Sequence, residues 1–225
     1  MTNVQVSSKA IFSEGVVLCE IHNSSIGHVP ITKEQEQYLS NASENRKWEF
    51  KAGRLCAAQA MEKLGGFQTE IRSGKRGEPH WPKGFIGSIT HKGRYAAAAV
   101  GRRESLLSIG IDVEMNDRLS EKVLQRIALP EELSWLKSQE GSKYQNPEKL
   151  LFAAKEAVFK AWFPIQQCWL GFSEAHVAFN EGMETFHVSI LRSGNLRSMS
   201  GKFFIDQDHI LVGVEVPIDN SSHLK

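Results

Sequence analysis

The chain has 225 residues, of which 41% are apolar and 24% are charged, and its formal net charge at pH 7 is +1. This composition is typical of a globular protein, and the length suits one large domain or two small ones. The near-neutral charge excludes a global field that attracts nucleic acid or an anionic membrane, so any anion site must be a local cluster. Because no apolar run approaches roughly 20 residues, we expect no membrane-spanning helix.

Cysteine usage and the N-terminal segment point to the same compartment. Cys19, Cys56 and Cys168 are widely spaced and odd in number, so they match neither a disulfide framework nor a zinc site. Residues 1–15 lack the basic leader and continuous apolar segment of a secretory signal. We therefore expect reduced thiols and a cytoplasmic protein.

The first half of the chain predicts one long helix and four strands. The helix runs from about Ser43, a suitable N-cap, to Leu64, where Gly65 and Gly66 stop it. Residues 72–84 are rich in Gly, Pro and basic side chains and predict a loop. The strands are expected at residues 16–21, 85–90, 95–101 and 106–114.

The second half predicts helices followed by a sheet. A helix is expected at residues 118–128, and Pro130 begins another short one. A longer helix starts at Asn146, a suitable cap followed by proline, and is expected to run to about Trp162 and end before Pro164. Alternating apolar residues then predict an antiparallel meander at residues 176–180, 185–191, 202–206 and 210–216.

A short internal similarity suggests two related halves. Residues 50–54 (FKAGR) resemble residues 152–156 (FAAKE), and each segment lies on a predicted helix that is followed by strands. So short a match also arises by chance. If it reflects a repeat, the chain has two related α+β halves with a boundary near residues 115–118.

Two carboxylates stand out because they lie inside an apolar run. Asp112 and Glu114 are two residues apart in the strand predicted at 106–114, so they point to the same face, roughly 7 Å apart along the chain. One interpretation is a strand end that carries two hydrated acids into solvent. The other is a pair that binds one small cation, because two buried like charges need a positive partner.

A second group of charges lies on the helix predicted at residues 146–162. Glu156 and Lys160 are four apart and share a face, which alone indicates only an ordinary Glu–Lys pair. Lys155 points roughly 100° away from Glu156. Apolar neighbours occupy much of the circumference, so we expect this helix to be buried against a polar site. These neighbours are Phe152, Ala154, Val158, Phe159 and Trp162.

The chemistry of these groups favours a hard metal ion. Magnesium prefers oxygen ligands, keeps several waters, and is commonly shared between one or two carboxylates and the phosphates of a substrate. The eight histidines are scattered, and no His and Cys set has the spacing of a zinc site. The sequence therefore predicts a magnesium site linked to phosphate.

Basic residues upstream form a candidate anion pocket. Arg46 and Arg54 lie eight residues apart on the first long helix, about 80° from one another around its axis, so both can reach one ligand. Each alone also fits a surface cation, and only as a set do the basic and polar residues describe a pocket for several phosphates. The remaining members of the set are Lys75 and Arg76 in the glycine-rich loop and Ser88 and His91 at the end of a strand.

Three segments, in this order, resemble the 4′-phosphopantetheinyl transferase family. Residues 110–114 (GIDVE) and 152–162 (FAAKEAVFKAW) look like its paired signature. Residues 78–91 (EPHWPKGFIGSITH) are similar to the version in the enterobactin-synthase component D branch. The resemblance covers roughly residues 44–175. One GIDVE-type pentapeptide is weak evidence, but three co-linear motifs are specific.

The resemblance implies a fold and a reaction. The fold would be α+β, a pseudo-dimer of two similar α+β lobes with the active site between them. Residues 1–115 would bind the nucleotide of coenzyme A and carry the Asp–Glu metal strand, and residues 116–225 would carry the Lys–Glu helix. The enzyme, of the holo-[acyl-carrier-protein] synthase type, would move 4′-phosphopantetheine from coenzyme A to a serine of an apo acyl or peptidyl carrier protein and release 3′,5′-ADP. Such enzymes activate fatty-acid, polyketide or siderophore synthases.

The resemblance also implies roles for individual residues. Asp112, Glu114 and Glu156 would hold Mg²⁺ with the diphosphate, while Lys155 and Lys160 would neutralise phosphate charge. From the chemistry of the residues themselves, a carboxylate near the metal, for which we favour Glu156 over Glu114, would take the serine proton directly or through a metal-bound water. The nucleotide end would be bound by Ser88 and His91 at its phosphates and by Arg46, Arg54, Lys75 and Arg76 at the nucleotide and its 3′-phosphate.

A docking surface for the carrier is expected near the metal. Leu119, Val123 and Ile127 recur at i, i+4 and i+8 as an apolar stripe with basic residues beside it. The stripe is either core or, as the resemblance implies, the place where an acidic carrier protein docks. An internal pseudo-dimer also predicts a monomer.

Two other functions stay open from the sequence. A Mg²⁺-dependent nuclease would use a similar carboxylate pair, but the chain has no long basic stripe. A non-catalytic module that binds coenzyme A or a carrier would not need all three acids and both lysines.

Overall fold

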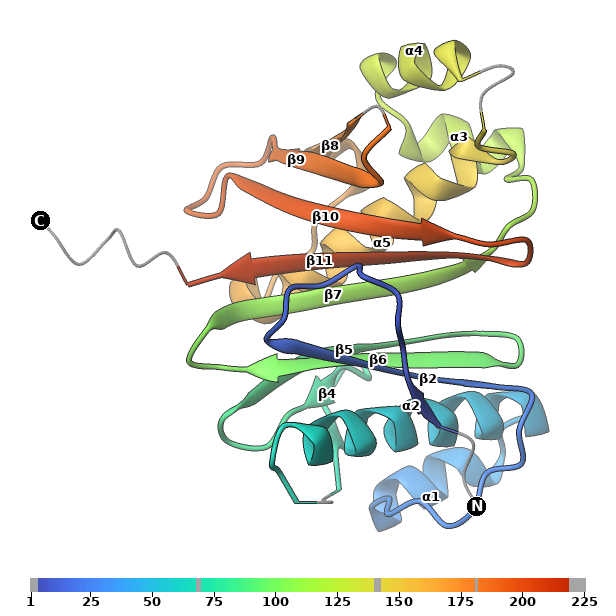
Figure 1. Cartoon of the computed structure of the whole chain (residues 1–225), viewed down its shortest axis with the longest axis vertical. Helices are drawn as coiled ribbons and strands as arrows, with labels where there is room; N and C mark the ends of the chain where they lie inside the picture. Colours follow the sequence, from blue (N-terminus) through green and yellow to red (C-terminus); the bar gives the residue numbers. More distant parts are fainter. Residues whose placement is uncertain (1–3, 68–69, 140–142, 181, 219–225) are drawn as a thin grey trace, which may run out of the picture. The chain divides into compact units, whose positions relative to one another are not determined.

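The computed structural model describes residues 4–67, 70–139, 143–180 and 182–218, and these form a mixed α+β protein (Figure 1). The first elements are β1 (Gln5–Val6), β2 (Val16–His22), α1 (Lys33–Ser40), α2 (Glu44–Lys63), β3 (Arg72–Ser73), β4 (Pro79–His80), β5 (Phe85–Lys92), β6 (Tyr95–Arg102) and β7 (Leu106–Met115). The later elements are α3 (Glu121–Ile127), α4 (Pro130–Ser138), α5 (Pro147–Gln166), the 3-10 turn η1 (Phe172–Glu174), β8 (Ala175–Asn180), β9 (Thr185–Ile190), β10 (Ser198–Ile205) and β11 (His209–Pro217). The predicted α+β class is confirmed.

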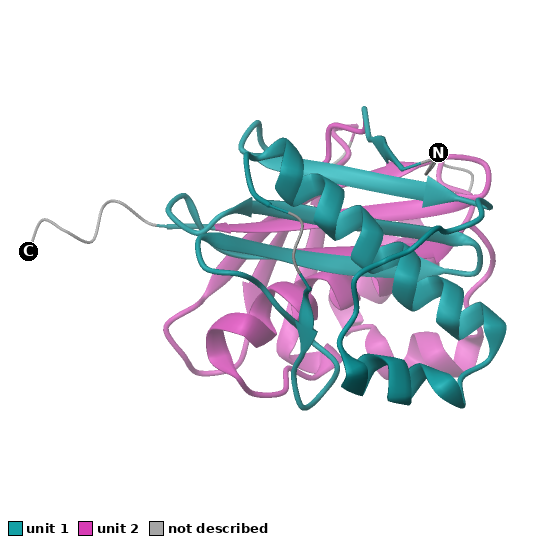
Figure 2. Ribbon diagram, turned by 90° about the horizontal axis from the view of Figure 1, so that it is seen from below, with its two compact units in different colours: residues 1–8, 13–109, 217–225 teal, residues 9–12, 110–216 magenta. Residues whose placement is uncertain are grey.

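The chain divides into two compact units (Figure 2). Unit 1 comprises residues 1–8, 13–109 and 217–225, and unit 2 comprises residues 9–12 and 110–216. The division passes through β7 between Ile109 and Gly110, whereas the sequence predicts a lobe boundary after Met115. Asp112 and Glu114 therefore fall in unit 2 together with α5. The relation of the two units as lobes of a pseudo-dimer stays a prediction.

Unit 1 contains a four-stranded antiparallel sheet, in the order β1-β2-β6-β5, with α2 packed on it. Helix α2 begins where the sequence predicts, because the Ser43 hydroxyl accepts a hydrogen bond from the Arg46 amide (3.2 Å). On the sheet side, a Cβ at Gly53 would lie 2.5 Å from Cγ2 of Ile89 on β5. Earlier on α2, Arg46 reaches His91 near the end of β5, with 2.9 Å between Nη1 and Nε2.

Unit 2 contains a five-stranded sheet in the order β7-β11-β10-β9-β8. Helix α5 packs its apolar side into a core made with side chains of β8 to β11. The short segment 9–12 belongs to this unit because Phe12 packs on β11, where a Cβ at Gly213 would lie 2.7 Å from Phe12 Cζ. The predicted antiparallel meander is confirmed, since β8–β9, β9–β10 and β10–β11 are all antiparallel pairs.

Several predicted elements differ from the structure. Helix α5 does not end before Pro164 but continues to Gln166, because a proline in the last turn removes only one backbone donor. The loop predicted at residues 72–84 contains the short paired strands β3 and β4. Helix α3 begins at Glu121 rather than at residue 118. In the part of the chain that the structure describes, none of the helices is long and apolar enough to cross a membrane.

Candidate active site

Gly110, Asp112 and Glu114 share the face of β7 that meets α5, because strand residues alternate between faces. A Cβ at Gly110 would overlap the carbonyl oxygen of Ala157 and lie 2.8 Å from the amide nitrogen of Ala161. Only glycine permits so close a packing of strand and helix. This packing brings Asp112 and Glu114 next to the polar face of α5.

Lys160 of α5 is the direct partner of Asp112. Its Nζ donates hydrogen bonds to Asp112 Oδ1 (2.7 Å) and to the carbonyl oxygen of Ile111 (3.0 Å). The Asp112 residue is only 6% exposed, whereas 29% of the Lys160 side chain is exposed. The pair joins β7 to α5 and leaves the lysine end in reach of solvent.

Lys149 is a candidate residue that the sequence analysis missed. Its Nζ lies 2.7 Å from Asp117 Oδ1 and 3.8 Å from Glu114 Oε2, and only 11% of its side chain is exposed. Lys149 and Glu156 are seven residues apart, or about two helical turns, so they share one face of α5. That spacing is the signal by which the sequence could have revealed it.

Glu156 lies between the two lysines along α5 and is half-buried. Its pKa is raised, first by burial and then by the negative charge of Asp112, with a further contribution from Glu114, while Lys160 opposes the shift. Glu156 lies one turn before Lys160 on α5, and Lys160 pairs with Asp112 on β7. The three predicted acids and Lys160 therefore lie at the same contact of β7 with α5, within unit 2.

Aromatic rings lie on both sides of Glu156 along α5. Phe152, four residues earlier, packs with Phe172 at 6.1 Å between ring centroids, and Phe159, three residues later, packs with Trp169 at 4.7 Å. Residues three and four apart share a helix face. Phe152 and Phe159 therefore lie on the side of α5 that carries Glu156, which agrees with the half-buried position of its carboxylate.

The acids suit a hard cation but do not form a complete protein cage. Within the described ranges, no three His, Cys, Asp or Glu side chains are arranged to hold a metal ion. Magnesium commonly takes only one or two protein carboxylates and completes its shell with water and substrate phosphate. Asp112, Glu114 and Glu156 offer oxygen donors alone, so they fit magnesium in that shared mode. The full three-ligand set stays a prediction.

The predicted role of Lys155 at a phosphate is wrong. Its side chain is 1% exposed, and its Nζ lies 2.7 Å from Oε2 of Glu132. The same Nζ donates to the carbonyl oxygens of Ile127 (2.8 Å), Phe172 (2.8 Å) and Ala175 (2.9 Å). These partners use all three N–H groups of the ammonium. Lys155 is therefore a buried structural residue, whereas its neighbour Glu156 faces the polar site.

In unit 1, the structure brings Arg46 and His91 together. Arg46 Nη1 lies 2.9 Å from His91 Nε2 and 3.6 Å from Glu49 Oε2, and His91 Nδ1 lies 3.4 Å from the same carboxylate oxygen. Because a guanidinium only donates, His91 Nε2 accepts and Nδ1 carries the hydrogen toward Glu49. A cation and an imidazole from α2 and β5 are thus held by one carboxylate.

Arg54 is buried rather than placed at the surface. Its Nε donates to the carbonyl oxygen of Ile71 (3.1 Å) and its Nη2 to Ser73 Oγ (3.1 Å), and its guanidinium lies 4.6 Å from the ring centroid of Phe50. Burial and the charge of Arg46 lower its pKa to about 10, so it keeps its charge at neutral pH. Arg54 therefore supports the segment that leads into the loop with Lys75.

The other predicted nucleotide residues occupy different places in unit 1. Lys75 and Arg76 are exposed in the turn between β3 and β4, where the amide of Arg76 donates to Glu78 Oε2 (2.9 Å). Ser88 is buried and lies on the opposite face of β5 from His91, because the two are three residues apart in a strand. Joint contact of Ser88 and His91 with the same phosphates therefore does not follow from the geometry of β5.

The predicted carrier-docking stripe is partly core. Ile127 is 2% exposed, so its proposed part in a docking surface is wrong. Leu119 and Val123 are half-buried, and Leu119 precedes the helix, with its amide 3.4 Å from Glu148 Oε1. The basic residues beside the stripe, Arg118, Lys122 and Arg126, are exposed.

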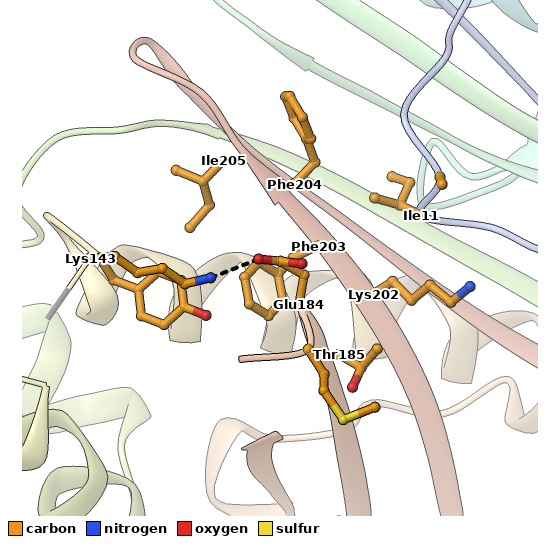
Figure 3. A pocket seen from close by; sticks show the side chains of 11 residues that line it. Ile11, Lys143, Glu184, Thr185, Lys202, Phe203, Phe204 and Ile205 are labelled. Carbon is orange, nitrogen blue, oxygen red and sulfur yellow. Dashed lines mark hydrogen bonds and ion pairs between the residues drawn. The ribbon is translucent and has the colours of Figure 1, made fainter. Parts of the chain in front are cut away.

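A groove of about 630 Å³ lies elsewhere in unit 2, beside β10 and the segment 9–12 (Figure 3). Apolar side chains such as Phe203 and Ile205 line it, and Lys143 forms an ion pair with Glu184 at 2.7 Å across it. None of its eleven lining residues belongs to the predicted site. We therefore assign it no part in the chemistry of the carboxylates.

These features define an α+β protein with an acid and lysine site on a strand and its facing helix, a combination suited to phosphate chemistry. Residues 34–101 match the family described as the 4′-phosphopantetheinyl transferase N-terminal domain. Residues 108–200 match the 4′-phosphopantetheinyl transferase superfamily, and this range includes α5 and all of β7 except its first two residues.

Named relatives agree with these matches. The chain is 38% identical over 194 residues to the 4′-phosphopantetheinyl transferase Npt of Nocardia iowensis, covering 80% of this chain and 86% of the relative. It is 38% identical over 166 residues to PptT of Mycobacterium tuberculosis, covering 74% and 72%. It is 31% identical over 154 residues to enterobactin synthase component D of Salmonella typhimurium, covering 68% and 62%.

The chain belongs to the 4′-phosphopantetheinyl transferase superfamily. It is an enzyme that transfers the phosphopantetheinyl group of coenzyme A to carrier proteins. The resemblance drawn from the three sequence motifs is confirmed.

Proposed function

We propose that this enzyme uses Mg²⁺ to move 4′-phosphopantetheine from coenzyme A to a serine of an apo acyl or peptidyl carrier protein, and that 3′,5′-ADP leaves. The observation that carries the proposal is the convergence of Asp112, Glu156 and Lys160 on two facing elements of unit 2. Acids that accept a cation, next to a lysine that accepts an anion, are the groups that a diphosphate substrate requires.

Asp112, Glu114 and Glu156 are the residues that would hold magnesium. When bound, magnesium would neutralise charge on the diphosphate oxygens. Lys160 adds a second positive charge, since its partly exposed ammonium can turn from Asp112 Oδ1 to a phosphate oxygen. Lys149 offsets the charge of Glu114 from the other side, with its Nζ 3.8 Å from Glu114 Oε2.

The carrier protein supplies the nucleophile. Its serine oxygen bonds to the phosphorus that bears pantetheine, and the bond from this phosphorus to the bridging oxygen breaks as 3′,5′-ADP leaves. The serine proton passes to a carboxylate. We assign this role to Glu156 rather than Glu114, because Glu156 is half-buried at the face shared with Lys160, whereas Glu114 is 8% exposed and lies against Lys149.

Residues of unit 1 are proposed to bind the nucleotide end of coenzyme A. Arg46 and His91 would contact phosphate, since they are held together by Glu49 and 38% of the Arg46 side chain is exposed. Lys75 and Arg76, exposed on their turn, are the proposed contacts for the 3′-phosphate.

The partner is proposed to be an acidic carrier domain that docks at α3. Arg118, Lys122 and Arg126 present positive charge there, which suits an acidic helical protein. The likeness to enterobactin synthase component D makes a carrier of siderophore synthesis one candidate, beside those of fatty-acid and polyketide synthases. We expect the enzyme to act as a monomer in the cytoplasm.

The test is an intact-mass assay on a panel of apo carriers, each incubated with the enzyme, coenzyme A and either Mg²⁺ or a chelator. We expect the mass of one phosphopantetheine to be added to at least one carrier, with Mg²⁺ only. Glu156→Gln should abolish the gain, and Glu62→Gln, at an exposed position of α2, should not. Full activity of Glu156→Gln would remove Glu156 from the reaction, and transfer in the chelator would remove the metal.

A further inference from the structure

A buried ion pair holds α5 on a side other than the one that carries Glu156 and Lys160. Glu132 of α4 and Lys155 of α5 have side chains that are 0% and 1% exposed, and Glu132 Oε2 lies 2.7 Å from Lys155 Nζ. Burial lowers the pKa of the Lys155 ammonium, and Glu132 opposes that shift. Neither side chain can contact a substrate, so any influence on the reaction must act through other residues.

The carboxylate of Glu132 is fully used by its surroundings. Oε1 accepts a hydrogen bond from the amide of Val177 on β8 (2.8 Å), and Oε2 accepts one from the amide of Leu129 at the start of α4 (2.7 Å). With the three carbonyl oxygens that Lys155 binds, the pair connects α3, α4, α5, η1 and β8. Five separate elements of unit 2 thus meet at two side chains.

The position of the pair on α5 determines which way the helix faces. Lys155 and Glu156 are consecutive, so they point about 100° apart around the axis. Glu156 and Lys160 then share a face, one turn apart. Because Lys155 Nζ is fixed by four partners, a rotation of α5 that moved Glu156 away from Asp112 would break these bonds. The pair therefore sets the direction in which Glu156 and Lys160 point.

The same pair reaches the proposed docking segment. One of its hydrogen bonds runs from Lys155 Nζ to the carbonyl oxygen of Ile127, the last residue of α3. Helix α3 carries the exposed Lys122 and Arg126. One hydrogen bond thus joins the end of α3 to the residue next to Glu156.

A requirement for stability alone does not account for an ionic pair at this place. Replacing a buried ion pair by apolar side chains of similar volume is often neutral or stabilising. An ionic pair differs from an apolar pair because it fixes the direction of both side chains. Its hydrogen bonds to five backbone groups tolerate little rotation of α5.

We propose that Glu132 and Lys155 are positioning residues for the transfer reaction: they fix the rotation of α5 that presents Glu156 and Lys160 to β7, and they connect the end of α3 to that helix. This inference rests on the proposed function, because it requires Glu156 and Lys160 to act on the substrate. It predicts a specific kinetic defect, in the chemical step rather than in the binding of coenzyme A.

The experiment compares Lys155→Met, Glu132→Gln and the double variant, with each rate divided by the folded fraction measured by tryptophan fluorescence. The substrates are coenzyme A and an apo carrier that the wild type modifies. We expect kcat to fall about 100-fold, because a displacement of about 1 Å at reacting groups has that effect. The KM for coenzyme A should change less than about twofold, since its proposed contacts lie in unit 1.

The double variant distinguishes an effect on the orientation of α5 from an effect on the stability of the fold. It leaves neither an uncompensated buried cation nor an uncompensated buried anion, so it should fold better than either single variant. We expect its kcat to stay low all the same. A matched control is Lys143→Met with Glu184→Gln, which removes an ion pair of the same 2.7 Å length at exposed positions of unit 2 and should leave kcat unchanged.

Two outcomes overturn the inference. One is a folded double variant with wild-type kcat, which would make the pair purely structural. The other is failure of all three variants to fold, which would mean that the pair supports folding as a whole rather than the direction of α5. Glu156→Gln, measured in the same series, distinguishes failure of this inference from failure of the proposed function. If Glu156→Gln is inactive while the double variant is fully active, only the positioning role is lost, whereas an active Glu156→Gln removes both.

Discussion

Lys160 Nζ and Asp112 Oδ1 are 2.7 Å apart across the contact between α5 and β7, although 48 residues separate them in the chain. The ammonium also binds the carbonyl oxygen of Ile111, so the strand holds it through two oxygens. This places a positive charge beside a buried acid at a point that solvent can reach. A substrate with a diphosphate group would find both a cation and a carboxylate there.

Replacement of Lys160 should affect the reaction far more than the fold. We expect Lys160→Met to lower kcat about 100-fold or more, because a positive charge that stabilises developing negative charge is lost. The free energy of unfolding should fall by only about 1 kcal/mol, since the pair is partly exposed. Kinetics and urea unfolding measure the two effects. Lys47→Met is the control, since the Lys47–Glu44 pair has the same 2.7 Å length and 31% of the lysine side chain is exposed. Equal kinetic effects in both variants would contradict the assignment.

Gly110 should tolerate no side chain. Because a Cβ there would overlap the carbonyl oxygen of Ala157, Gly110→Ala must push α5 away from β7. We expect a loss of about 1–3 kcal/mol in the free energy of unfolding, together with a lower kcat. Gly15→Ala, where no atom lies within 4 Å of the added Cβ, should change neither. A Gly110→Ala enzyme with wild-type stability would show that the close packing is not required.

Lys149 should compete with the metal for Glu114. In Lys149→Met the carboxylate loses its nearby ammonium, so we expect the protein without Mg²⁺ to be less stable by about 1–2 kcal/mol. Added Mg²⁺ should then raise the melting temperature of the variant more than that of the wild type, because ligand binding stabilises the folded state. Lys137→Met, at an exposed position of α4, serves as the control. The same Mg²⁺-induced shift in all three proteins would refute the competition.

Replacement of Arg46 should affect the binding of coenzyme A, whereas replacement of Arg54 should affect the stability of the protein. Arg46→Met removes a partly exposed cation, and we expect the KM for coenzyme A to rise about tenfold with little change in unfolding. Arg54→Met removes two hydrogen bonds to residues 71–73 from a buried site, and we expect a loss of about 2 kcal/mol in stability. Steady-state kinetics and thermal unfolding of both variants check this division. The reverse pattern would make Arg54 the nucleotide contact and Arg46 the structural residue.

Much of the fold and part of the site follow from local patterns in the sequence. The Ser43 cap, the apolar side of α5 and the alternation in the later strands each depend on residues that are close in the chain. The same holds for the shared face of Asp112 and Glu114. These features are predictable because the periods of helix and strand alone determine them.

The direction of Lys155 could not be predicted in the same way. Its spacing from Glu156 gives the angle between the two side chains, but not which of them faces the polar site. That choice depends on the contact of α5 with Gly110 and on the buried acid Glu132, which lies 23 residues earlier on another helix. Arg54 is a similar case, since its partners at Ile71 and Ser73 come from a segment that looks like a plain loop.

The most direct test of the account is a Mn²⁺ titration followed by electron paramagnetic resonance, with Mn²⁺ in place of Mg²⁺ and coenzyme A present. The wild type should bind Mn²⁺, and Asp112→Asn and Glu156→Gln should each bind it at least about tenfold more weakly. Equal Mn²⁺ affinity in the wild type and in both variants would show that these carboxylates do not hold the metal.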